Sequence, residues 1–266
     1  MKIVDETSER GVVERRFDLE VGGEAVPGIH WLPDGATGPH PTVLVGHGGT
    51  QHKRVPNVLA LARRLVRHLG VGVVALDAPE HGDRITDPEA ARAMLERIAA
   101  RRREGGRGLP PMDRERMRAL EKRVPKHIAE WRALIDDLQS DERYAAGPFA
   151  WWGVSMGTRH GLPLIVEEPR ITAAVLGLAG QRLVEGDAAG SLAGRVTIPI
   201  LFLFQWDDEL MSRQSGLDLW DALGTRDKTM HINPGGHVEM PGFEYRATEE
   251  FFARHLLSAT PEPAPA

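Results

Sequence analysis

The chain has 266 residues, 41% of them hydrophobic, and a formal net charge of −5 from 33 basic and 38 acidic residues. This length and apolar content suit one large α/β domain, and the charge balance does not favour a nucleic-acid-binding protein. Because the chain has no cysteine, disulfides, thiolate metal sites and cysteine nucleophiles are excluded. The beginning, MKIVDETSERGVVERR, is charged and lacks the apolar core of a signal peptide, and no apolar run reaches the roughly 18 residues of a membrane span. We therefore expect a cytoplasmic protein that does not cross a membrane.

The apolar pattern predicts strands that alternate with helices. Val12–Val21 and Glu24–Leu32 are expected to form a hairpin, because Gly22-Gly23 between them supplies a tight turn. Short apolar runs predict further strands, and apolar residues at helical spacing predict helices between them. These strands are expected at residues 41–45, 71–76, 149–153, 171–178, 198–204 and 228–232, and helices at 55–69, 125–138 and 243–257. The alternation predicts a mostly parallel sheet of about eight strands with helices on both faces.

One charged segment interrupts this alternation after the fourth predicted strand. Residues 84–124 contain ERIAARRREGGRGLPPMDRERMRALEKR, which predicts two short helices broken by Gly105-Gly106 and Pro110-Pro111. This insertion is either a lid over a site, with arginines near a substrate, or a solvated helical excursion, because charge runs are usually solvated faces. We expect a single domain over residues 1–258 that includes the insertion, and a disordered Pro/Ala-rich tail at residues 259–266.

The stretch WWGVSMG, residues 151–157, places a serine between two glycines. Gly153-Val154-Ser155-Met156-Gly157 matches G-x-S-x-G, with an apolar strand before it and a helix after it, which is the setting that this motif requires. The glycines leave room for a strained turn that exposes Ser155 as a nucleophile. The backbone N–H of Met156 would then face the oxyanion that develops on a substrate. The alternative is an ordinary strand–turn–helix junction.

A serine hydroxyl is a weak nucleophile, so it needs a base and a carboxylate that orients the base. The candidate base is His237, in the glycine-rich loop that directly follows the last predicted strand; the alternative is an ordinary surface-loop histidine. Asp207 and Asp208 both follow the buried strand at residues 198–204, at the carboxyl end where active sites of parallel sheets lie. Both aspartates qualify by position.

A further glycine pair follows the third predicted strand, in Gly46-His47-Gly48-Gly49-Thr50. Glycines there allow backbone N–H groups to approach a substrate oxygen. Gly49 and Gly48 are therefore candidates to complete an oxyanion hole with Met156.

The other histidines near these motifs are expected to be structural. His47 fits a role in which its ring bonds to nearby backbone, and His160 fits a packing role along the helix after Ser155. A metal site would have to combine His47 with His52 or His81, but no compact ligand spacing supports one. We expect no bound metal.

Together these motifs resemble the α/β-hydrolase superfamily over about residues 10–258. LDAPEHGDR is similar to the D-x-P-G-H-G segment of that family, with Glu80 in place of the first glycine, and NPGGH is similar to its G-G-H loop. QWDDEL is similar to the G-x-x-D-x-hydrophobic pattern, and aligning Leu210 with the hydrophobic position assigns the catalytic acid to Asp208. The chain order of serine, aspartate and histidine is also that of the family.

Within the superfamily the chain is similar to the branch of dienelactone hydrolases and prolyl-oligopeptidase-like esterases. It departs from dienelactone hydrolases because Ser155 takes the place of a cysteine nucleophile. The Gly48-Gly49 pair looks like the H-G-G oxyanion loop of esterases, with Gly49 as the preferred donor.

The resemblance implies an α/β-hydrolase fold and a serine hydrolase of the carboxylesterase type, with Ser155, His237 and Asp208 as its catalytic triad. It implies a small-molecule ester substrate and no cofactor. Trp206 and Trp152 are candidates for substrate contact, although tryptophans in such positions more often belong to the core. A thioesterase, lactonase, peptidase or C–C hydrolase would use the same residues, and a non-catalytic ligand-binding homologue is the alternative from another class. The natural substrate and the oligomeric state stay open.

Overall fold

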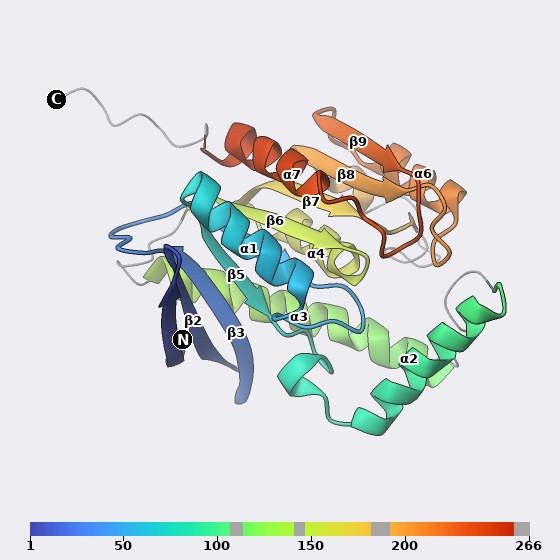
Figure 1. The fold of residues 1–266 in the computed structure, drawn as a ribbon, viewed down its shortest axis with the longest axis horizontal. Coiled ribbons are helices and arrows are strands. Elements are labelled where there is room, and N and C mark those ends of the chain that lie inside the picture. The colour runs from blue at the N-terminus through green and yellow to red at the C-terminus, as the bar shows by residue number, and fades with distance from the viewer. Residues whose placement is uncertain (107–113, 141–146, 182–191, 258–266) are drawn as a thin grey trace.

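The computed structural model describes residues 1–106, 114–140, 147–181 and 192–257. They form a mixed α/β domain around a nine-stranded sheet (Figure 1). The strands are β1 (Lys2–Glu9), β2 (Val12–Val21), β3 (Glu24–Pro33), β4 (Thr42–Gly46), β5 (Gly72–Leu76), β6 (Phe149–Val154), β7 (Ile171–Gly177), β8 (Ile200–Gln205) and β9 (Lys228–Asn233). The helices are α1 (Pro56–Leu69), α2 (Pro88–Arg103), α3 (Arg114–Ser140), α4 (Met156–Glu167), α6 (Arg213–Ala222) and α7 (Glu244–Phe252), with short 3₁₀ turns at Gly82–Arg84 and Ala193–Arg195 and a π-helical turn at Ala253–Leu257.

The sheet combines an antiparallel edge with a parallel body. Its strand order is β1-β2-β3-β5-β4-β6-β7-β8-β9, and every pair from β5 to β9 in this order is parallel. All eight expected strands are present, with ends within two residues of the prediction, and the hairpin turns at Gly22 and Gly23, which have φ of 60° and 82°. The expectation of a mostly parallel sheet is confirmed.

The ninth strand, β1, was not expected. It pairs antiparallel with β2 at the edge of the sheet, and all eight of its residues are exposed. Since neither of its faces is buried, its sequence carries no apolar alternation that could reveal a strand. The insertion therefore follows β5, which is the fifth strand along the chain rather than the fourth.

Helices cover both faces of the sheet, as expected. Side chains of α3, α4 and α6 pack on one face together with Trp151, whereas side chains of α1 and α7 pack on the other face together with Trp152. Successive residues of a strand point to opposite faces, so these neighbouring tryptophans of β6 belong to different halves of the core. Trp152 is completely buried, which corrects the expectation that it contacts a substrate.

The insertion consists of α2 and the first part of α3. The helix α2 ends at Arg103, before Gly105 with its φ of 72°, which agrees with the predicted break; Pro110-Pro111 lies outside the described residues, as does the predicted tail at 259–266. The prediction of a separate helix from Pro125 is wrong, because α3 runs through Pro125 without interruption. Pro125 lies on the exposed side of α3, where water can solvate the carbonyl that proline leaves without a partner. Beyond it, burial of Trp131, Leu134 and Leu138 stabilises the helix.

The parallel strands end at one edge of the sheet, and the loops that follow β4, β5, β6, β8 and β9 gather there. These loops carry the residues that the sequence singled out. Among the described helices, none combines the length and apolar character that a bilayer crossing requires.

Candidate active site

Ser155 lies at the sharp turn between β6 and α4. Its φ of 57° and ψ of −117° belong to a backbone region that side chains rarely adopt, so the turn stores strain. The flanking residues have to be glycines because other backbone atoms approach them closely. A Cβ on Gly157 would lie 2.3 Å from Gly46 O, and one on Gly153 would lie 2.7 Å from Gly157 O. The motif therefore has the geometry of a nucleophile elbow.

Hydrogen bonds to β7 hold the elbow in its strained conformation. The N–H of Ser155 donates to Gly177 O over 2.8 Å. The hydroxyl of Thr158, in the first turn of α4, accepts from the N–H of Gly177 over 2.8 Å and lies 2.9 Å from Gly153 O. Because Thr158 is fully buried, these bonds are shielded from water.

The His237 ring lies between Ser155 and Asp208. Ser155 Oγ is 2.9 Å from His237 Nε2, and Asp208 Oδ2 is 2.7 Å from His237 Nδ1. The arrangement fits an Nδ1–H that donates to Asp208 and an Nε2 that accepts from the serine hydroxyl. The other oxygen of Asp208 accepts the N–H groups of Leu210 and Met211 over 2.7 and 2.9 Å, so the carboxylate is fixed on both sides.

Asp207, the other aspartate that qualified by position, has different partners. Its Oδ2 accepts from the N–H of Gly235 over 3.3 Å, and its Oδ1 pairs with Arg213. The geometry therefore separates two neighbouring aspartates that the pattern of residues alone left equivalent. It brings Asp208 to the histidine.

The loop after β4 lies against the start of α4. A Cβ on Gly49 would lie 3.9 Å from Met156 Cβ, so these residues are neighbours beside the nucleophile. The N–H of Met156 opens α4, where the first N–H groups of a helix have no partner within it. The N–H of Gly48 donates to Gln51 Oε1 over 3.1 Å, so it is already engaged. Gly49 and Met156 remain as the candidate oxyanion donors.

Solved structures with the same architecture include several hydrolases of esters. A cold-adapted esterase from an Arctic intertidal metagenomic library is 37% identical to this chain, with a TM-score of 0.75. The match covers 96% of this chain and 100% of the chain of that esterase. The chain belongs to the esterases of the α/β-hydrolase superfamily.

More distant structures share the fold of this esterase. Dienelactone hydrolase from Anabaena variabilis is 20% identical, with a TM-score of 0.65 over 93% of this chain and 100% of its own. Acetyl xylan esterase 1 from Thermoanaerobacterium sp. is 14% identical, with a TM-score of 0.67 over 95% of this chain and 86% of its own. No protein-family model matches the sequence, and a comparison with curated proteins found no match.

His47 has the structural role that the sequence suggested. Its Nδ1 lies 2.8 Å from Gly48 O, and its Nε2 accepts the N–H of Ala78 over 3.1 Å, so the ring joins the loops after β4 and β5. Burial lowers the pKa of His47 to about 3, which keeps the ring neutral and able to accept from Ala78.

More histidines lie near His47, of which His127 and His160 are buried and His81 is half-buried. The rings of His47 and His81 are 5.3 Å apart between centroids, and those of His127 and His160 are 5.1 Å apart. Burial lowers the pKa of His81, His127 and His160. Neighbouring histidines lower that of His81 and His160 further, whereas the hydrogen bond to Glu130 opposes the shift of His127. His160 thus packs against a neighbouring ring, as expected. Among the residues that the structure describes, no group of three side chains is arranged to hold a metal ion.

An ion-pair network centred on the buried Lys53 joins the loops after β4 and β5. Lys53 Nζ lies 2.5 Å from Asp77 Oδ2 and 2.6 Å from Asp83 Oδ2, and the backbone N–H of Lys53 donates to Asp77 Oδ1 over 2.9 Å. The bond from Lys53 lowers the pKa of Asp83. Nearby, Arg84 binds Glu130 through two nitrogens over 2.8 and 2.7 Å, which ties the loop after β5 to α3. Sequence reasoning missed this network, because a lone lysine in a loop carries no sign of burial.

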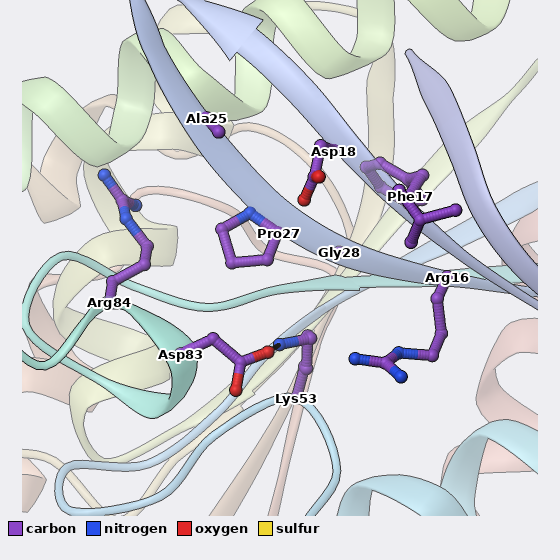
Figure 2. A pocket seen from close by; sticks show the side chains of 10 residues that line it. Arg16, Phe17, Asp18, Ala25, Pro27, Gly28, Lys53, Asp83 and Arg84 are labelled. Carbon is purple, nitrogen blue, oxygen red and sulfur yellow. Dashed lines mark hydrogen bonds and ion pairs between the residues drawn. The ribbon is translucent and has the colours of Figure 1, made fainter.

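A cavity of about 330 Å³ lies beside this network (Figure 2). The residues that line it come from the N-terminal strands and from the loops after β4 and β5: Val4, Arg16, Phe17, Asp18, Ala25, Pro27, Gly28, Lys53, Asp83 and Arg84. Figure 2 shows Lys53 and Asp83 side by side at its edge. Since Ser155 is not among the lining residues, this cavity does not present a substrate carbonyl to the nucleophile.

Trp206 follows β8 and is 40% exposed, in contrast to the buried Trp152. The guanidinium of Arg213 lies 4.5 Å from its ring centroid, and Arg213 Nε donates to Trp206 O over 2.6 Å. The indole of Trp206 is thus held at the surface next to Asp207 and Asp208. It remains the aromatic residue that could contact a substrate.

Proposed function

We propose that this esterase cleaves carboxylic esters of small or medium-sized substrates through an acyl-enzyme on Ser155. The observation that carries the proposal is the continuous set of contacts from Ser155 Oγ through His237 to Asp208, at 2.9 and 2.7 Å. A non-catalytic ligand-binding homologue would not need all three side chains at hydrogen-bonding distance from one another. The ester-cleaving relatives support the same reaction class.

In the first step His237 Nε2 takes the proton of Ser155 while Oγ attacks the ester carbonyl carbon. The N–H groups of Met156 and Gly49 bind the oxyanion of the tetrahedral intermediate. Asp208 keeps the proton of His237 on Nδ1 and stabilises the imidazolium. His237 then gives its proton to the leaving alcohol as the C–O bond breaks, which leaves the acyl group on Ser155.

In the second step water attacks the acyl-enzyme and loses its proton to His237 Nε2. The carboxylic acid leaves when His237 returns that proton to Ser155 Oγ. No step needs a cofactor. The proposed substrate contact is Trp206, and a cytoplasmic location stays a prediction from the sequence.

Labelling with a fluorophosphonate probe, followed by peptide mass mapping, tests the proposal. We expect the label on Ser155, no label in Ser155→Ala, and strongly slowed labelling in His237→Ala. Full labelling elsewhere, or ester hydrolysis that survives in Ser155→Ala, would contradict the mechanism. A panel of p-nitrophenyl esters, acyl-CoA thioesters, lactones and aminoacyl amides then distinguishes an esterase from a thioesterase, lactonase or peptidase with the same triad.

A further inference from the structure

Three carboxylates besides Asp208 bind the loop that carries His237. The N–H of Gly235 donates to Asp207 Oδ2 over 3.3 Å, that of Gly236 to Glu239 Oε2 over 2.7 Å, and that of His237 to Glu209 Oε2 over 2.9 Å. Three successive backbone donors thus each meet a carboxylate. The acidic run after β8 supplies two of these acceptors as well as Asp208, so one short segment fixes both the ring and the backbone of His237.

Glu209 also reaches the insertion through its second oxygen. Glu209 Oε1 lies 2.8 Å from Arg102 Nη2, in the last turn of α2. The two side chains are 23% and 34% exposed, so the pair is partly shielded from solvent. No residue of α2 is buried, so this helix does not reach the site through the hydrophobic core. The ion pair joins it directly to the segment that holds His237.

The contact lies where a small displacement matters most. The N–H that binds Glu209 belongs to His237 itself, so the bond fixes the backbone from which the ring extends toward Ser155. A ring that has to sit 2.9 Å from the nucleophile tolerates little movement at its base, because misplacement of about 1 Å can cost about 100-fold in rate. An acceptor that carries a full charge holds a backbone N–H more firmly than a neutral one.

We propose that Glu209 is a positioning residue for His237, and that Arg102 holds Glu209 in place, so that the insertion helix α2 supports catalysis from outside the triad. This inference rests on the proposed function of Ser155 and His237. Neither Glu209 nor Arg102 touches the reacting atoms; both act through the backbone of His237.

Three variants separate the two contacts of Glu209. Glu209→Ala removes both, Glu209→Gln keeps an oxygen for the N–H of His237 but loses the charge that binds Arg102, and Arg102→Ala removes only the ion pair. We expect kcat for p-nitrophenyl acetate to fall about tenfold in Glu209→Ala and about two- to fivefold in the other two, with KM changed less than about twofold. Arg103→Ala is the matched control, because Arg103 is the exposed neighbour on α2, and its kinetics should equal those of the wild type.

The double variant Arg102→Ala/Glu209→Ala tests whether Arg102 acts through Glu209. If it does, the double variant loses no more activity than Glu209→Ala alone. Effects that multiply would overturn the role of Arg102, and a Glu209→Ala enzyme with the kcat of the wild type would overturn the role of Glu209.

Active-site labelling distinguishes positioning from loss of structure. Misplacement of His237 lowers the rate constant of fluorophosphonate labelling while nearly every molecule is still labelled in the end. Partial unfolding instead lowers the labelled fraction and leaves the rate constant of the remaining molecules unchanged, and that result would contradict positioning. If Glu209→Ala does not fold, Glu209→Gln and Arg102→Ala decide the question by the same readout. A wild-type enzyme without label on Ser155 would defeat the proposed function itself, which no result on Glu209 alone does.

Discussion

The indole of Trp151 occupies the space that a side chain at Gly161 would fill. A Cβ on Gly161 would lie 2.0 Å from Trp151 Nε1, and one on Gly46 would lie 2.3 Å from Trp151 Cζ2. Trp151 thus packs between the end of β4 and the helix α4. One buried ring sets the distance between the two segments that supply the proposed oxyanion donors.

Gly161→Ala should therefore destabilise the protein. The added methyl group has to displace a buried ring, and overpacking of this kind costs about 1–3 kcal/mol. The free energy of unfolding, measured by urea denaturation, checks the prediction. Gly242→Ala is the control, because a Cβ there meets nothing within 4 Å. Equal destabilisation by both substitutions would mean that the contact with Trp151 is not the cause.

The parts of the site that depend on strand ends could be predicted from the sequence. Buried strands of a parallel sheet read as continuous apolar runs, so such runs predict the loops with Ser155 and Asp208. The loop with His237 follows β9, a short strand with a single buried residue, and its glycines are the clearer signal. The choice of Asp208 over Asp207 needed the resemblance to a family, and the geometry now places Asp208 against the ring. Burial of single side chains was harder to predict, as the core position of Trp152 shows.

The remaining features depend on contacts between distant segments. Lys53 is 3% exposed because Asp77 and Asp83 surround it, 24 and 30 residues farther along the chain. Similarly, Glu209 forms an ion pair with Arg102, which lies in the insertion. A local pattern of residues contains no sign of such partners. The strand β1 could not be predicted for a different reason: it is an edge strand with no buried residue, so its sequence has no apolar pattern.

Asp208→Asn should lower kcat by about three to four orders of magnitude and leave KM nearly unchanged. Asp208 Oδ1 accepts two backbone N–H groups, so the oxygen of the asparagine would stay there and its amide NH₂ would face His237 Nδ1. Nδ1 would then become the acceptor and Nε2 would carry the proton, so the ring could no longer take the proton of Ser155. Steady-state kinetics with p-nitrophenyl acetate tests this. A variant within tenfold of the wild type would show that Asp208 does not control the tautomer.

Stability should decline as the pH falls below about 6.5, before the carboxylates titrate. Burial lowers the pKa of His47 and of His30 to about 3, and that of His160 is also well below its usual range. These rings stay neutral in the folded chain, whereas the unfolded chain takes up a proton on each as the pH falls through about 6.5. The unfolded state then binds more protons, and each such histidine reduces the free energy of unfolding by up to about 1.4 kcal/mol per pH unit.

His160→Phe isolates one of these contributions, because phenylalanine keeps an aromatic ring against His127 but does not titrate. Urea denaturation between pH 7.5 and 5.5 should give a shallower loss of stability in this variant than in the wild type. Parallel curves for the two proteins would mean that His160 does not take up a proton on unfolding in this range.

Lys53→Met should destabilise the protein by about 3–5 kcal/mol, because it leaves the carboxylate of Asp77 buried without its cation. The second substitution Asp77→Asn removes that uncompensated charge, and its amide oxygen can still accept the backbone N–H of residue 53. Its NH₂ group loses only the bond that Oδ2 accepts from the N–H of Asp83, which costs less than a buried unpaired charge. The double variant should therefore be more stable than Lys53→Met alone, by urea denaturation at neutral pH. If the two losses simply add, the ion pair is not what makes Lys53 important, and packing of its aliphatic chain is the better explanation.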